Sequence, residues 1–146
     1  MRAVSVKIST IAHATEDLAN VLQAISNLCP VDFPRKVETR KLRGHYGNEI
    51  TVCQLTVKGR FKAEQFLNNL WGKLSTLDQT SIHDEISTRL DETGNLHLRI
   101  DKQAALTGRF SLQESDPIKV EISFRLEARQ GKRVSEMVRL KLLALG

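Results

Sequence analysis

The sequence has few cysteines, few aromatic residues and no long apolar segment, and each shortage excludes a class of protein. Only Cys29 and Cys53 occur among 146 residues, which argues against a disulfide-rich secreted domain and favours two reduced, buried thiols in the cytoplasm. Aromatic residues make up 5% of the chain, which argues against a sheet that stacks RNA bases on several rings. No apolar run approaches the roughly 18 residues that span a bilayer, so we expect no membrane partner.

Sequence motifs of enzymes are also missing. The four histidines lack the spacing of metal ligands, and neither a phosphate-binding glycine motif nor an HExxH sequence occurs. We therefore predict a protein that is not an enzyme and has no cofactor and no metal. A metal-dependent nuclease remains an alternative because of one acidic cluster, although ion pairs with nearby arginines are the simpler interpretation. The cluster consists of Asp84, Glu85, Asp91, Glu92 and Asp101.

What the chain does have is positive charge concentrated in one stretch. Residues 35–62 contain eight basic and two acidic residues, a net charge of +6, while the whole chain carries +5. Residues 119–146 add a second basic segment with a net charge of +4. If the two segments meet in the fold, they form one basic face, which is typical of proteins that bind nucleic acid. The alternative is that these charges only keep the surface solvated.

The periodicity of apolar residues predicts both strands and helices. Alternation predicts strands at residues 4–8, 35–42, 50–57 and 118–126, the last of them central. Helical spacing predicts helices at residues 18–28, 62–74 and 134–145, the first of them capped by Thr15. Shorter elements are expected as a helix within 75–85, a helical turn at 101–106 and a strand at 109–112.

Two hairpins decide the predicted fold class. Residues 35–42 and 50–57 flank a glycine loop at 44–48, and residues 86–90 and 96–100 flank a turn at 92–95. Hairpins outnumber possible parallel crossovers in this order. The sequence therefore predicts an α+β fold: a single domain over residues 1–146 with a mostly antiparallel sheet and helices packed on one face.

The loop Gly44-His45-Tyr46-Gly47-Asn48 is the first candidate contact with RNA. Its glycines could let backbone N–H groups approach a phosphate, while His45 and Tyr46 stack on a base or hydrogen-bond to it. Alternatively, the glycines only permit positive φ in a hairpin turn, with Tyr46 packed on a neighbouring strand. The spacing of Gly44 and Gly47 also matches the GxxG loop of KH domains, but that loop joins helices and this one joins predicted strands.

The basic residues around this loop complete the candidate site. Those near the hairpin tip are favoured because strand twist brings both sides of the hairpin toward one ligand. Lys102 is included because it stands at the start of a short helix, where anions are favoured, although Asp101 as a cap of that helix is the preferred interpretation there. The predicted RNA-binding residues are Arg40, Lys41, Arg43, His45, Tyr46, Lys58, Arg60 and Lys102.

Three sequence strings resemble those of a known family. They are VSVKISTIAHAT at residues 4–15, LRGHYGN at 42–48 and DETGNLHLRIDKQAA at 91–105. Their order and spacing are similar to those of archaeal proteins described as predicted RNA-binding proteins or predicted exosome subunits, and the similarity covers nearly the whole chain. Glu49 departs from the family pattern, which often has proline there. The resemblance implies an α+β fold similar to the ribosomal protein that binds 5S RNA, no known catalytic centre and an archaeal cytosolic setting.

The resulting hypothesis is a non-catalytic RNA-binding protein that recognises mainly phosphate through a basic face. It would be an accessory to RNA processing or degradation, with RNA and RNA-processing or exosome proteins as its partners. The main alternative is a protein–protein adaptor that makes no direct contact with RNA and docks through an open sheet face or the carboxy-terminal helix.

Overall fold

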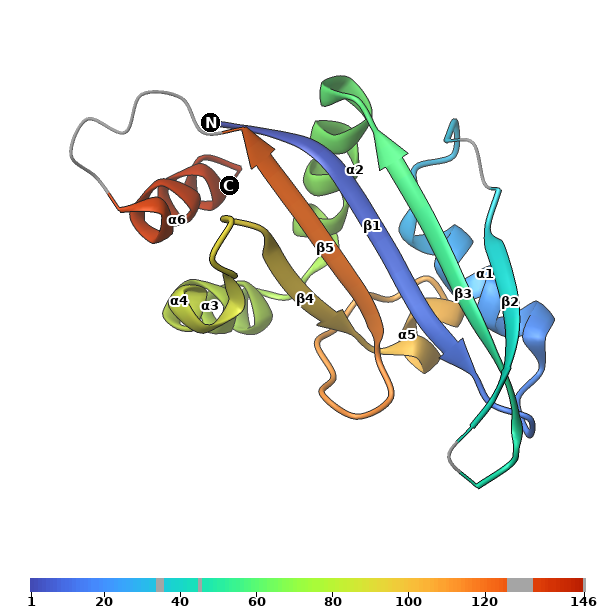
Figure 1. Ribbon diagram of the computed structural model, residues 1–146. Coiled ribbons are helices and arrows are strands. Elements are labelled where there is room, and N and C mark those ends of the chain that lie inside the picture. The colour runs from blue at the N-terminus through green and yellow to red at the C-terminus, as the bar shows by residue number, and fades with distance from the viewer. Residues whose placement is uncertain (34–35, 45, 126–132, 146) are drawn as a thin grey trace.

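Five strands form one antiparallel sheet in the order β2-β3-β1-β5-β4 (Figure 1). The computed structural model describes residues 1–33, 36–44, 46–125 and 133–145. The strands are β1 (Arg2–Ala12), β2 (Glu38–Arg43), β3 (Glu49–Lys58), β4 (Leu96–Ile100) and β5 (Ile118–Arg125). The helices are α1 (Leu18–Leu28), α2 (Arg60–Lys73), α3 (Thr76–Asp84), α4 (Ile86–Arg89), α5 (Lys102–Leu106) and α6 (Val134–Ala144).

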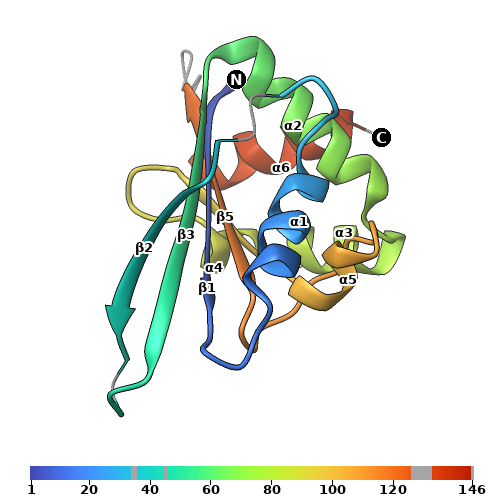
Figure 2. The ribbon, with the colours of Figure 1, turned by 90° about the vertical axis from the view of Figure 1, so that its right-hand side faces the viewer.

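The helices cover one face of the sheet (Figure 2). Alternate residues of β1 and β5, such as Val6, Ile8 and Val120, are buried against them, and Phe66 and Trp71 of α2 lie in the same core. Burial of one face of each strand is what the period-2 patterns require. The predicted α+β fold, with a mostly antiparallel sheet and helices on one face, is confirmed. Among the described helices, none is long and apolar enough to cross a bilayer.

The helix caps agree only partly with the sequence prediction. Asp17, not Thr15, caps α1, because its carboxylate accepts a hydrogen bond from the backbone N–H of Ala19 at 2.9 Å. Asp101 caps α5 as the preferred interpretation had it, accepting hydrogen bonds from the N–H groups of Gln103 and Ala104. These side-chain acceptors satisfy amide donors that have no partner inside a helix.

The predicted second hairpin is wrong. Residues 86–89 form the short helix α4, and Leu90 makes only an isolated bridge with Leu96. Strand β4 pairs instead with β5, through Leu96 to Ile100. The expected strand at 109–112 is reduced to a single bridge between Ile100 and Leu112. Strand β5 has neighbours on both sides, but β1 occupies the middle of the sheet.

The first hairpin is confirmed, and it extends past the helices. Strand β2 pairs with β3 from Glu38 opposite Gln54 to Arg43 opposite Glu49. In both ribbon views, its tip projects beyond the helical layer (Figures 1 and 2). The turn needs Gly47, whose φ of +79° lies in the left-handed region that side chains disfavour. His45 lies outside the described residues.

Candidate nucleic-acid interface

The face of the sheet opposite the helices carries mostly basic charge. Residues that alternate with the buried ones point to this face, which we call the open face. The strand register places cations from all five strands on it. Among the described strand residues, its basic side chains are Arg2, Lys7, Arg40, Lys58, Arg99, Lys119 and Arg125, and its acidic side chains are Glu38 and Glu121. Arg99 also pairs with the loop residue Glu114, whose Oε2 lies 3.3 Å from Arg99 Nη1.

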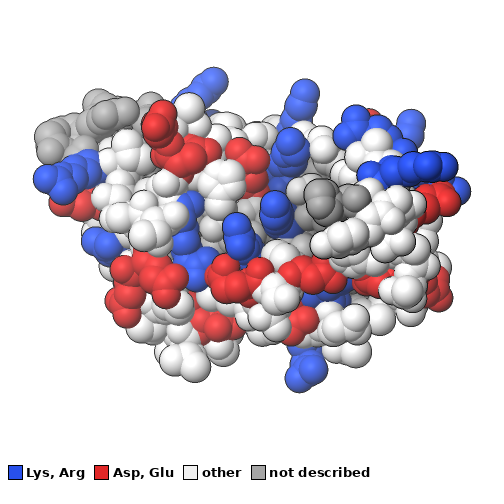
Figure 3. Space-filling model, turned by 60° about the horizontal axis from the view of Figure 1, so that its bottom comes forward, with Lys and Arg blue, Asp and Glu red and all other residues white. Residues whose placement is uncertain are grey.

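Three of the cations lie on neighbouring strands along a diagonal of the sheet. Lys7 of β1 is opposite Thr56 of β3 and Glu121 of β5, while Lys58 is opposite Ser5 and Lys119 is opposite Ser9. Adjacent strands are about 4.8 Å apart, so these side chains can contact one extended ligand. Figure 3 shows a band of acidic groups across the middle of the view, with most of the basic groups above it and a few below it.

The predicted RNA-binding residues do not all converge at the hairpin tip. Arg40 and Lys58 share the open face, but they are about 20 Å apart, since six positions of β3 separate Lys58 from Val52, the partner of Arg40. Lys41 and Arg43 point to the other side of the hairpin, where Lys41 Nζ lies 3.4 Å from Glu49 Oε1. The structure thus divides the predicted cluster between two sides of the hairpin.

The remaining predicted residues lie at opposite ends of β3. Tyr46 stands at the hairpin tip with 87% of its surface exposed. Arg60 begins α2, after the far end of β3, and its guanidinium lies 5.2 Å from the ring centre of Phe61. The predicted site therefore follows the length of β3 and does not surround one loop.

Lys102 is buried in an ion-pair network and is left out of the interface. Only 5% of its surface is exposed. Its Nζ donates to the Ile11 carbonyl at 2.8 Å and lies 3.1 Å from Glu16 Oε1 and 3.2 Å from Asp116 Oδ2. Three acceptors use all three donors of the ammonium group. Lys102 thus joins the end of β1 to the starts of α1, α5 and β5.

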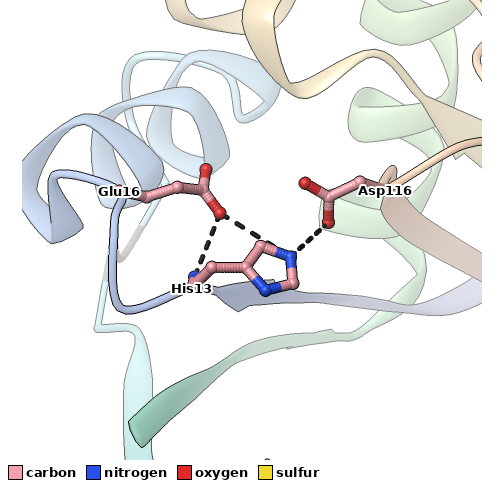
Figure 4. A group of neighbouring side chains, drawn as sticks. All are labelled: His13, Glu16 and Asp116. Atoms are coloured by element: carbon pink, nitrogen blue, oxygen red, sulfur yellow. Dashed lines mark hydrogen bonds and ion pairs between the residues drawn. The ribbon is translucent and has the colours of Figure 1, made fainter. Parts of the chain in front are cut away.

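His13 contacts both carboxylates of this network, Glu16 and Asp116 (Figure 4). Its Nε2 lies 3.0 Å from Asp116 Oδ1, and its backbone N–H donates to Glu16 Oε1 at 3.0 Å. Burial alone would raise the pKa of Asp116, but hydrogen bonds and charge from His13 and Lys102 hold it below its ordinary value. The three groups are close enough together to ligate a metal. We interpret them as structural, because the Lys102 ammonium already pairs with both carboxylates.

The acidic cluster of the nuclease alternative does not act as a unit. Glu85 pairs with Arg89 at 3.0 Å, Asp101 caps α5, and Asp91 Oδ2 lies 2.8 Å from His97 Nε2. The hydrogen bond from His97, followed by that from the backbone N–H of Asn95, lowers the pKa of Asp91 well below its ordinary value. Asp91 and His97 lie beside Glu121 in a second group of potential metal ligands, which includes only one member of the predicted cluster.

The lowered pKa of Asp91 predicts a pH-dependent stability. The Asp91 carboxylate stabilises the fold above its unfolded-state pKa of about 3.9, and this contribution is lost as the pH falls toward the lower folded-state pKa. Asp91→Asn should therefore reduce the free energy of unfolding at pH 7, and its difference from wild type should shrink below pH ~4. Urea unfolding at pH 7, 5 and 3 measures this. The control is Glu92→Gln, because the neighbouring Glu92 makes no hydrogen bond among the described residues. If the effect of Asp91→Asn on the free energy of unfolding does not depend on pH, the prediction is contradicted.

A second basic feature lies at the far end of β3. Strand β2 pairs with β3 only as far as Gln54, which leaves the last residues of β3 at the edge of the sheet. There Lys36, Lys58 and Lys62 line a small hollow of about 130 Å³. None of these lysines has an ion-pair partner within the part of the chain that the structure describes. The hollow therefore offers three positive charges to an anion.

Sequence reasoning missed most of the open face. Alternation in the sequence puts Lys7, Lys119 and Arg125 on the polar sides of their strands, but nothing local indicates that β1 lies between β3 and β5. The available signal was alternation, which assigns each cation to one side of its own strand. Strand order, set by pairing between distant segments, decides whether those sides coincide.

The model of a family described as RNA binding matches residues 5–124 of the chain. The chain therefore belongs to this family of RNA-binding proteins. The fold is that of a small α+β protein whose sheet has a basic open face. This family membership confirms the resemblance to archaeal RNA-binding proteins that the sequence strings indicated.

Particular relatives make the family concrete. The chain is 34% identical to the RNA-binding protein PAB1135 of Pyrococcus abyssi over 121 residues, which cover 81% of this chain and 79% of that protein. The crystal structure of protein AF2318 from Archaeoglobus fulgidus, of the family DUF54, superposes with a TM-score of 0.80 at 33% identity, covering 99% of this chain and 100% of the other. Mth689, a DUF54 protein of Methanothermobacter thermautotrophicus, has a TM-score of 0.78 at 27% identity, with 98% and 99% coverage.

Proposed function

We propose that this chain is a non-catalytic, cytoplasmic RNA-binding protein that holds RNA across the open face of its sheet. The observation that carries the proposal is the excess of seven basic over two acidic side chains among the strand residues of that face, which come from all five strands. One of the seven, Arg99, is paired with Glu114. A family described as RNA binding and a relative named an RNA-binding protein support RNA as the polyanion. This function is an accessory one in RNA processing or degradation.

Recognition of the RNA backbone fits this surface better than recognition of base sequence. The described strand residues of the open face include no Phe, Tyr or Trp on which bases could stack. Lysine and arginine contacts to phosphate fix position but carry no direct sequence information. The hollow lined by Lys36, Lys58 and Lys62 supplies a further phosphate contact at the end of β3. In the proposed complex, electrostatic attraction to phosphate therefore supplies most of the affinity, and the preference for particular base sequences is weak.

The salt dependence of binding tests this proposal. With three to five phosphate contacts, the logarithm of the association constant for a short single-stranded RNA should fall with the logarithm of salt concentration, with a slope of about −2 to −4. Fluorescence anisotropy of a labelled RNA, titrated with wild-type protein at four salt concentrations, gives the slope. An affinity that salt does not change would remove the proposal.

A protein–protein adaptor is the second candidate, favoured by one observation on α6. Leu140 and Leu143, three positions apart on this helix, are 50% and 58% exposed. Together they form a small apolar patch on the surface, and such patches can mark protein–protein contacts. An RNA-processing or exosome protein could cover them. If salt-dependent RNA binding is absent and a partner stays bound after nuclease treatment, but is lost with Leu140→Ser and Leu143→Ser, the adaptor function is the correct one.

A further inference from the structure

A hollow of about 450 Å³ lies where the tip of the β2–β3 hairpin meets the end of β1. Ile11 and Ile50 line it, and both point to the open face by the strand register. Tyr46 and Asn48 of the hairpin tip form one wall, while His13 and Thr15 of the connection to α1 form another. Its volume falls in the range of about 300–1,000 Å³ that is usual for small-ligand sites.

The chemistry of the lining differs from that of the rest of the open face. Ile11 and Leu42 are 39% and 40% exposed, so the hairpin end of the face is apolar where the sheet centre is basic. Tyr46 adds the aromatic ring that the strand residues of the open face lack, and it lines the same hollow. The side chains of Asn48 and Thr15 supply hydrogen-bond donors and acceptors at the rim.

A ligand for this hollow needs apolar planar faces, a polar edge and an attached negative charge. Arg40, opposite Val52 on the open face, brings positive charge next to the apolar floor. An unstacked nucleobase meets these requirements: it stacks on an aromatic ring, hydrogen-bonds through its edge and carries a phosphate on its sugar. An apolar side chain of a protein partner matches the floor but not the flanking cations.

We propose that this hollow takes one unstacked base of the bound RNA, with Tyr46 stacking on it. The inference rests on the proposed function, because phosphate contacts on the open face bring the RNA to the hollow. It adds a preference for single-stranded or bulged RNA, since bases in a regular duplex are already stacked. It does not require a particular base, because every base has a face that can stack.

A comparison of RNA with a base-free oligomer tests the hollow separately from the phosphate contacts. The two probes are a ten-nucleotide uridine RNA and a ribose-phosphate oligomer of the same length and charge without bases. Wild type should bind the RNA roughly 5- to 150-fold more tightly, the range found for loss of one stacking contact. Tyr46→Ala should bind both probes equally, and Tyr46→Phe should behave as wild type. Leu77→Ala, which removes an equally exposed side chain from the helical layer, should change neither affinity.

The possible outcomes separate this inference from the proposed function. If wild type binds both oligomers equally and with a steep salt dependence, the base site is wrong and the phosphate-led function stands. If Tyr46→Ala weakens both probes alike, the ring does not act by stacking on a base, and the inference is overturned. If wild type binds neither oligomer, both proposals are overturned. Thermal unfolding of Tyr46→Ala and Tyr46→Phe shows whether each variant keeps its fold, which is expected because 87% of the Tyr46 surface is exposed.

Discussion

Lys102→Met should lower the free energy of unfolding by about 2–3 kcal/mol. Removal of one partner from a buried ion pair typically costs about 3–5 kcal/mol, because the other charge stays behind unpaired. We expect a smaller loss than this typical cost because the side chain of Asp116 is 48% exposed and keeps part of its hydration. Urea unfolding at pH 7 measures the change. Lys41→Met, which breaks the exposed contact with Glu49, is the matched control and should change the free energy by less than about 1 kcal/mol.

Two further measurements make this prediction specific. Replacement of Glu16 by Gln and Asp116 by Asn in the Lys102→Met background should restore part of the stability, because the remaining carboxylates no longer repel each other. The salt slope of RNA binding should not change with Lys102→Met, whereas loss of a phosphate contact would reduce it by close to one. Equal destabilisation by Lys102→Met and Lys41→Met would show that the network is not structural. A salt slope reduced by about one would show that Lys102 contacts a phosphate of the RNA.

Neutralisation of three open-face lysines should weaken RNA binding by roughly 10²–10³-fold near 0.1 M salt. The variant combines Lys7→Gln, Lys58→Gln and Lys119→Gln, which removes one cation from each of β1, β3 and β5. Each lost phosphate contact also removes about 0.7–0.9 from the salt slope, so the slope should become less steep by about 2–3. All three side chains are exposed, so the fold should be retained.

The control is a second triple variant with the same change in net charge. Lys73, Arg109 and Arg133 are exposed cations outside the strands, and their replacement by Gln leaves the open face intact. If net charge alone drives association, both triple variants lose affinity equally, and the open face has no special role. If the open face binds RNA, the control stays within a few-fold of wild type. Anisotropy titrations with the same labelled RNA measure both.

The sequence predicted the elements of this fold better than their arrangement. Strands β1, β3 and β5 and helices α1 and α6 follow from periodicity because each buries one side along its own length. Strand β2 buries neither side, and its place in the first hairpin followed from the glycine loop between it and β3. The second hairpin failed because Ile86 and Leu90 are separated by four residues, a spacing that satisfies a helix as well as a strand. Strand β4 then pairs with β5, whose first residue lies 22 positions beyond Leu96 along the chain. No local pattern records such a partner.

The same distinction explains the site. Charge counting along the chain located Arg40 and Lys58, but the neighbours that complete the open face come from β1 and β5. Lys102 has the sequence context of a surface residue at a helix start. Its burial depends on Glu16, 86 positions away, and on Asp116 in another loop. Both outcomes depend on tertiary contacts, which composition and spacing do not contain.

The outer strand β2 has a consequence for how copies of this protein meet. It is hydrogen-bonded to β3 alone, so one row of its backbone groups faces outward and could template another strand. All six of its residues are exposed, and four of them, Glu38, Arg40, Lys41 and Arg43, are charged. If the β2 edges of two copies paired, the arginines and lysines of one copy would lie close to those of the other and repel them. The charges that we expect to attract a polyanion thus also discourage edge-to-edge aggregation.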